Sequence, residues 1–112
     1  MIGMATYLAI AASVWGPTPC GPQPQVSYTA LTDPRYAALA IVDECRIEVD
    51  SPSNADFDGP MRCSFILHEY GHLVGMQHSD NPRSIMQPLI MRPDPRCSWK
   101  RLFKVSRKGA WG

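Results

Sequence analysis

The three histidines of this 112-residue chain all lie within residues 68–78, which read HEYGHLVGMQH. His68 and His72 are four residues apart, so on a helix they lie one turn above each other on the same face. Gly75 follows three residues later, and a glycine can adopt the left-handed conformation that ends a helix and turns the chain. His78 comes after that turn. The stretch therefore predicts a helix that ends in a tight turn, with three imidazoles directed toward one point.

This arrangement is typical of a catalytic zinc site. Three imidazole nitrogens hold a zinc ion at about 2.0–2.1 Å and leave a fourth position for water, whereas structural sites close all four positions with protein atoms. Glu69 follows the first histidine, so its carboxylate lies beside the metal, where it can take a proton from the water. The alternative is that His68 and His72 are polar residues on an exposed helix face. We expect His68, His72 and His78 to bind one Zn²⁺, with Glu69 as the catalytic base.

The order of residues in this stretch resembles the metzincin signature HExxHxxGxxH of zinc metallopeptidases. The sequence that follows, HSDNPRSIMQP, resembles the matrixin branch, in which a serine follows the third histidine and a short loop leads to a methionine turn. The turn here is residues 84–88. By this resemblance Met86 lies beneath the zinc as an apolar floor and is not a ligand, a role that is compatible with ordinary core packing.

Two residues depart from the patterns of related families. Matrixins commonly have a tyrosine after the turn methionine, and this chain has Gln87. Astacins and serralysins have a tyrosine one position further on, where this chain has Pro88. We therefore expect no tyrosine that alternates as a metal ligand.

The chain before the histidines predicts one helix and two extended segments. Residues 2–15 are apolar but too short to span a bilayer, and no Lys or Arg precedes them, so we expect a helix on the core rather than a signal peptide. The glycine and proline cluster at 16–24 ends it. Residues 25–31 predict a strand. Residues 36–50 begin ambiguously as helix or strand and end as a strand, because apolar and polar side chains alternate over 45–50.

Two more helices are expected in the second half, over residues 61–75 and 97–105; the second has Trp99, Leu102 and Phe103 on one side. At 112 residues the chain is expected to form a single domain, residues 1–112. The family resemblance implies the α+β class. It implies a minimal zincin-like fold with a small twisted sheet, an N-terminal helix, an active-site helix, a Met-turn and a C-terminal helix. The active-site helix and Met-turn occupy residues 63–91, and a basic C-terminal segment occupies 92–112.

The same resemblance predicts how a substrate binds. The edge strand expected near residues 40–49 pairs with the substrate backbone, because an unpaired edge offers donors and acceptors for an added strand. Leu89, Ile90 and Met91 follow the Met-turn, where the family builds the wall of its primed-side pocket, so we expect an apolar residue after the cut bond. These three residues are equally compatible with plain core packing.

The chain has four cysteines, Cys20, Cys45, Cys63 and Cys97, and no pair has the C-x-x-C spacing of a zinc ribbon. Two disulfides are expected in so small a domain, which points to an extracellular or otherwise oxidising compartment. Four cysteines permit three pairings, of which we expect Cys45–Cys63 with Cys20–Cys97.

A calcium site is not expected. Asn54, Asp56, Asp58 and Gly59 match the first half of a calcium-binding loop. The twelfth position of that pattern needs a glutamate and is occupied by Phe65.

The net charge of +1 is unevenly distributed, since residues 1–91 carry four basic and nine acidic side chains and residues 92–112 carry seven basic and one acidic. We interpret the basic end as a solvated face and expect no nucleic-acid partner. The sequence thus predicts a monomeric zinc endopeptidase acting on a peptide or protein. The alternative is a non-catalytic module that keeps zinc as a staple and holds a partner with its basic tail, which Glu69 argues against.

Overall fold

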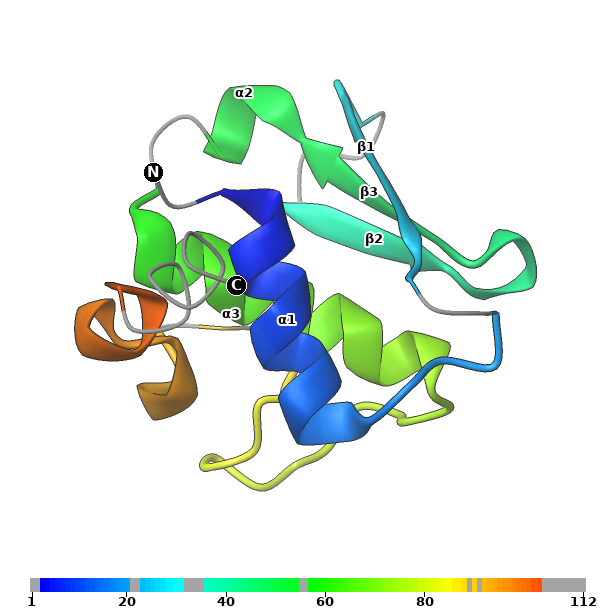
Figure 1. Ribbon diagram of the computed structural model, residues 1–112. Helices are drawn as coiled ribbons and strands as arrows, with labels where there is room; N and C mark the ends of the chain where they lie inside the picture. Colours follow the sequence, from blue (N-terminus) through cyan, green and yellow to red (C-terminus); the bar gives the residue numbers. More distant parts are fainter. Residues whose placement is uncertain are drawn as a thin grey trace.

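The computed structural model describes residues 3–20, 23–31, 36–54, 57–88, 90 and 92–103. Its elements follow one another along the chain as α1 (Met4–Trp15), β1 (Gln25–Thr29), β2 (Ala38–Ile41), the 3-10 turn η1 (Val42–Glu44), β3 (Arg46–Asp50), the single turn α2 (Ser51–Asn54), α3 (Gly59–Leu73) and the 3-10 turn η2 (Pro95–Cys97). Residues 99–103 form a further helical turn. The two long helices pack against each other, and the small sheet lies along α3 (Figure 1). This is the α+β, minimal zincin-like architecture that the sequence predicted.

The sheet has three strands within the described residues, in the order β1-β3-β2. β1 is parallel to β3, and β2 is antiparallel to it. Ile47 and Val49 of the central strand are buried, while their neighbours Arg46 and Glu48 are half-exposed, which confirms the predicted alternation over residues 46–49. At the two ends it does not hold, because Cys45 lies outside the strand and Asp50 is buried.

The single edge strand expected near residues 40–49 is wrong, because the chain reverses inside that segment. The 3-10 turn at η1 and Cys45, whose φ is 55°, connect two antiparallel strands. A left-handed conformation is uncommon in a residue other than glycine, so the usual sign of a turn is missing here. β3 is therefore the central strand, and on this side of the sheet the edge is β2 alone.

α3 begins two residues before the expected start because Asp58 caps it. The Asp58 carboxylate accepts a hydrogen bond from the Met61 backbone N–H at 3.0 Å, and Pro60 fits the first turn, where its missing N–H costs nothing. Most of the helix is buried, with Leu67 and Tyr70 at its centre. α3 thus forms the middle of the core.

α1 is held against α3 by two polar contacts as well as by apolar packing. The Trp15 indole N–H donates to the Leu67 backbone oxygen at 2.9 Å, and the Tyr70 hydroxyl donates to the Gly16 oxygen at 2.8 Å. Gly16 ends α1 with a φ of +81°. This confirms the predicted end of the helix, because Gly16 is the first residue of the glycine and proline cluster at 16–24. Among the described residues, no helix is long and apolar enough to cross a membrane.

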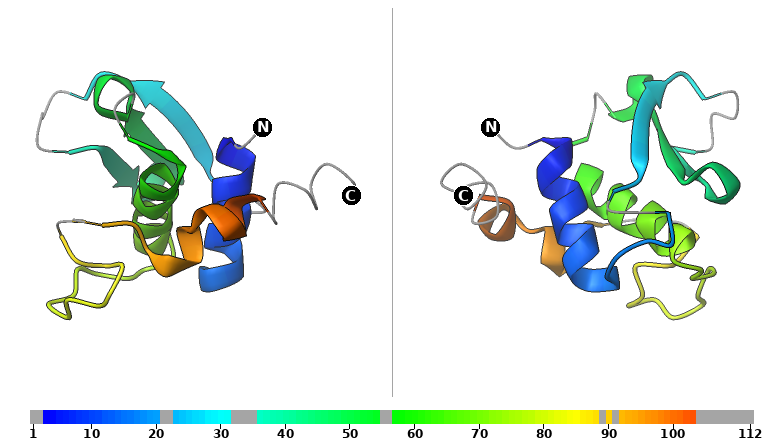
Figure 2. Two further views of the ribbon diagram at one scale, coloured as in Figure 1. Left: turned by 90° about the vertical axis from the view of Figure 1, so that its left-hand side faces the viewer. Right: turned by 45° about the vertical axis from the view of Figure 1, so that its right-hand side comes forward.

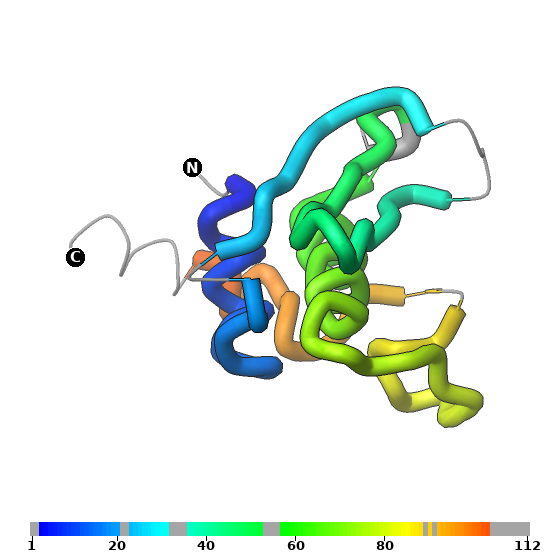
Figure 3. Tube along the Cα trace, turned by 90° about the vertical axis from the view of Figure 1, so that its right-hand side faces the viewer, coloured from blue at the N-terminus to red at the C-terminus, as the bar shows by residue number. Residues whose placement is uncertain are grey.

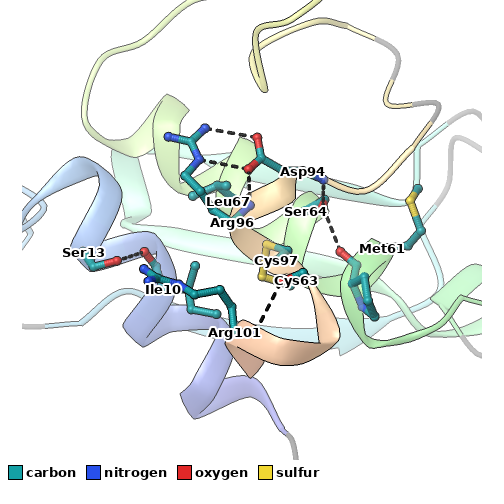
Figure 4. Close-up of a disulfide and its surroundings, with 12 residues drawn as sticks. Ile10, Ser13, Met61, Cys63, Ser64, Leu67, Asp94, Arg96, Cys97 and Arg101 are labelled. Atoms are coloured by element: carbon teal, nitrogen blue, oxygen red, sulfur yellow. Dashed lines mark hydrogen bonds and ion pairs between the residues drawn. A yellow bond between two sulfur atoms is a disulfide. The ribbon is translucent and has the colours of Figure 1, made fainter. Parts of the chain in front are cut away.

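The C-terminal segment is fixed to the start of α3 by buried hydrogen bonds (Figure 4). The Asp94 backbone N–H donates to the Ser64 hydroxyl oxygen at 2.8 Å, and that hydroxyl donates to the Pro60 oxygen, also at 2.8 Å. The Asp94 carboxylate accepts two hydrogen bonds from the Arg96 guanidinium, and this pairing holds the pKa of Asp94 below its usual value against the opposing effect of burial.

The disulfides join Cys20 to Cys45 and Cys63 to Cys97, so the expected pairing is wrong. The hairpin explains the first: its turn lies beside the entry to β1, where the Gln25 N–H donates to the Cys45 oxygen at 3.1 Å. The second ties the start of α3 to η2. Two such bridges are typical of a chain that folds in an oxidising compartment.

We predict that removing either disulfide by paired alanine substitution lowers the free energy of unfolding by about 3–4 kcal/mol, since the bridges close segments of 25 and 34 residues. The loss should be larger for Cys63→Ala with Cys97→Ala, because those two side chains are fully buried and their removal also leaves a cavity. Denaturant unfolding followed by circular dichroism measures both variants. Unchanged midpoints in both would contradict this account of stability.

Candidate metal centre

The structure brings the three histidines together. His68 and His72 lie on successive turns of α3, and their ring centroids are 4.9 Å apart. The ring of His78 lies 4.9 Å from that of His72 and 5.3 Å from that of His68. The potential ligand atoms all lie within 4.8 Å of one another, which is close enough for all three residues to hold a single ion.

The turn after α3 determines where His78 lies. The Gly75 N–H donates to the His72 oxygen at 3.1 Å, and the Met76 N–H donates to the Gly71 oxygen at 2.9 Å. This pair of bonds closes a helix when the intervening residue is left-handed, and Gly75 has a φ of +95°. A Cβ at Gly75 would meet nothing within 4 Å, so its backbone conformation, and not lack of space, requires the glycine.

Backbone carbonyls orient two of the imidazoles. The His68 Nδ1 lies 2.7 Å from the Ile85 oxygen, and the His72 Nδ1 lies 2.9 Å from the Met76 oxygen. Because a carbonyl only accepts, each Nδ1 must carry the proton, which leaves the Nε2 lone pair available to a metal. Burial lowers the pKa of His68 to about 4 and also lowers the pKa of His72. Both rings are therefore neutral at pH 7, as metal ligands must be.

Glu69 is buried beside this cluster. One of its carboxylate oxygens lies 3.7 Å from the His68 Nε2, and its side chain is 9% exposed. Burial raises the pKa of Glu69 to about 8, although a hydrogen bond from the Ala40 backbone N–H acts in the opposite direction. A cation held by the histidines favours the charged form of a carboxyl at this distance.

Met86 packs against α3 at Gly71. Its side chain is fully buried, and a Cβ added to Gly71 would lie 2.6 Å from the Met86 sulfur and 3.1 Å from the Trp15 ring. The Ser79 N–H donates to the Met86 oxygen at 2.9 Å, which ties the methionine turn to the segment after His78. The close approach at Gly71 was not predicted; a glycine inside a helical pattern is the signal that points to it.

The histidines and Glu69 open into a cleft of about 670 Å³. β2 forms one wall and Pro88 with Ile90 contributes to the rest. Of the predicted pocket residues, Ile90 lines the cleft, whereas Leu89 and Met91 lie outside the described residues. The sequence did not reveal three aromatic residues of the lining, Tyr36, Phe57 and Phe65.

The α+β fold and the three-histidine cluster define a zincin-like domain. A comparison with known protein families matches residues 46–101, half of the chain, to the family described as Matrixin. The chain therefore belongs to the matrixins, a family of zinc metallopeptidases. Searches among curated proteins and among solved structures gave no significant match.

We predict that the purified, untagged chain binds one zinc ion and that His78→Ala weakens this binding strongly, since the two helical imidazoles then lose their third partner. Gln77→Ala is the matched control, because Gln77 lines the same cleft next to His78. Elemental analysis after gel filtration measures the zinc. A wild type without zinc, or His78→Ala with unchanged affinity, would show that the three-histidine site is wrong.

Proposed function

We propose that this chain is a zinc-dependent endopeptidase that uses His68, His72 and His78 to hold the metal and Glu69 as the general base. The observation that supports this best is the position of a buried carboxylate beside the histidine cluster, at the floor of a cleft large enough for a peptide. When bound, zinc supplies a Lewis acid that polarises a scissile carbonyl and lowers the pKa of a water molecule.

Glu69 moves the proton in this proposal. Its oxygen lies 3.7 Å from the His68 Nε2, so a water molecule near the cluster is within its reach. The carboxylate takes a proton from that water as the water attacks, and it then gives the proton to the nitrogen of the leaving amine. As a whole residue Glu69 is only 7% exposed, so the surrounding protein shields its carboxylate from bulk solvent.

The edge of β2 orients the substrate. The Asp50 N–H donates to the Ala37 oxygen at 2.9 Å, which makes residues 37 and 50 a hydrogen-bonded pair of the antiparallel ladder. Such pairs alternate with non-bonded ones, so the backbone groups of Ala38 and Ala40 point away from β3. Both residues line the cleft. The Ala40 N–H already donates to Glu69, so the other outward-facing groups of Ala38 and Ala40 are those that a substrate backbone can pair with. An extended peptide can therefore add to this edge as a further strand.

The two disulfides support an extracellular location for this activity. A peptide or protein is the expected substrate, because the chain belongs to a family of peptidases. Ile90 in the cleft supports the preference for an apolar residue after the cut bond.

We predict that Glu69→Ala keeps the fold and the zinc but hydrolyses a peptide library at least about 10²-fold more slowly, because the general base is lost. Glu48→Ala is the control, since it removes a carboxylate from the central strand outside the cleft lining. Cleavage is followed by mass spectrometry at equal zinc content. Equal activity of Glu69→Ala would rule out this mechanism, and an inactive but zinc-loaded wild type would favour the non-catalytic binding module.

A further inference from the structure

The helical turn at residues 99–103 exposes two aromatic rings. Trp99 is 47% exposed and Phe103 is 55% exposed, and the rings stack with centroids 5.8 Å apart. The sequence predicted that both would lie on one side of a helix with Leu102, and of the three only Leu102 is fully buried. Leu102 therefore anchors this turn to the core, while the two rings are each about half exposed.

The same turn is positively charged. Lys100 and Arg101 lie between the aromatic residues and are exposed. Residues 98–112 contain five basic and no acidic side chains, whereas the preceding body of the chain is acidic. Trp99 and Phe103 share one face of this turn, and Lys100 and Arg101 extend from its other exposed sides. We call these four residues the aromatic–basic patch.

The aromatic–basic patch lies away from the metal centre. The Trp99 ring covers Gly59, since a Cβ added there would lie 3.1 Å from two of its ring atoms. Gly59 is the first residue of α3, and His68 comes nine residues later, about 14 Å along the helix axis. The turn at 99–103 (orange) and the segment that follows α3 (yellow) lie on opposite sides of α3 in Figure 2 (left) and Figure 3. A partner on the patch therefore leaves the cleft accessible.

We propose that the aromatic–basic patch attaches the protein to the surface of an anionic lipid bilayer. Trp and Phe rings insert at the level of the headgroups, while Lys and Arg side chains are attracted to the anionic lipids. The aromatic residues of the patch match the apolar boundary below the headgroups, and its basic residues match the charge of the anionic lipids. A sulfated polysaccharide or an acidic protein would use the cations but would leave two stacked rings exposed to water.

Sedimentation with lipid vesicles tests the proposal on the full, zinc-loaded chain. We expect binding to phosphatidylcholine vesicles that contain phosphatidylserine, little binding to phosphatidylcholine alone, and weaker binding as the salt concentration rises. Lys100→Glu with Arg101→Glu should weaken binding at least about tenfold. Arg83→Glu with Arg92→Glu changes the net charge by the same amount at two other exposed positions and should bind like the wild type.

Substitutions at Trp99 and Phe103 test the contribution of the aromatic rings. Trp99→Ser with Phe103→Ser should lose vesicle binding; Phe103→Ser alone leaves the Trp99 contact with Gly59 intact, and it serves if the double variant does not fold. Tyr28→Ser, at a 59% exposed aromatic residue of β1, is the control. If Arg83→Glu with Arg92→Glu lost as much vesicle binding as Lys100→Glu with Arg101→Glu, net charge alone would explain the binding. That result would overturn the proposal. Absence of vesicle binding, whether or not the patch binds heparin or a second copy of the chain, would also overturn it.

Discussion

The left-handed backbone at Gly75 is the constraint on which the three-histidine cluster depends. Two histidines on one helix face approach an ion from one side only, so the third must come from a chain that turns back. The Gly75 and Met76 N–H groups close α3 by bonding to carbonyls of its last turn, and His78 follows directly. The Met76 oxygen of the same turn accepts the His72 Nδ1–H. One turn thus places the third imidazole and orients the second.

α3 can serve as the base of this turn because the rest of the small domain holds it on several sides. α1 is bonded to it through Trp15 and Tyr70, and the Cys63–Cys97 disulfide ties its start to the C-terminal segment. The methionine turn packs against Gly71, where a larger side chain would meet the Met86 sulfur. A short chain buries limited apolar area, so covalent and polar ties of this kind supply rigidity that a larger core would otherwise provide.

The parts of the structure that could be predicted from the sequence are those set by local spacing. These local properties are the period of α3, the four-residue separation of His68 and His72, and the glycine after them. The role that family resemblance assigns to Met86 stays a prediction; the structure shows that its side chain is buried against α3. The hairpin could not be predicted, because its turn contains a left-handed Cys45 where a glycine would have been recognisable. The disulfide pairing depends on that hairpin, so the predicted pairing was wrong for the same reason. The aromatic lining of the cleft was not predicted for a related reason. Phe57 and Phe65 come into contact only through the tertiary fold, and no local pattern in the sequence indicates it.

In the proposed site three imidazoles, and no other protein side chain, hold a zinc ion with one position left open. X-ray absorption at the zinc edge of the loaded, substrate-free protein tests this most directly. The three-imidazole site predicts four nitrogen or oxygen neighbours at about 2.0–2.1 Å, with the multiple-scattering pattern of three imidazoles. Sulfur neighbours at about 2.3 Å, or a pattern that fits fewer than three imidazoles, would contradict it.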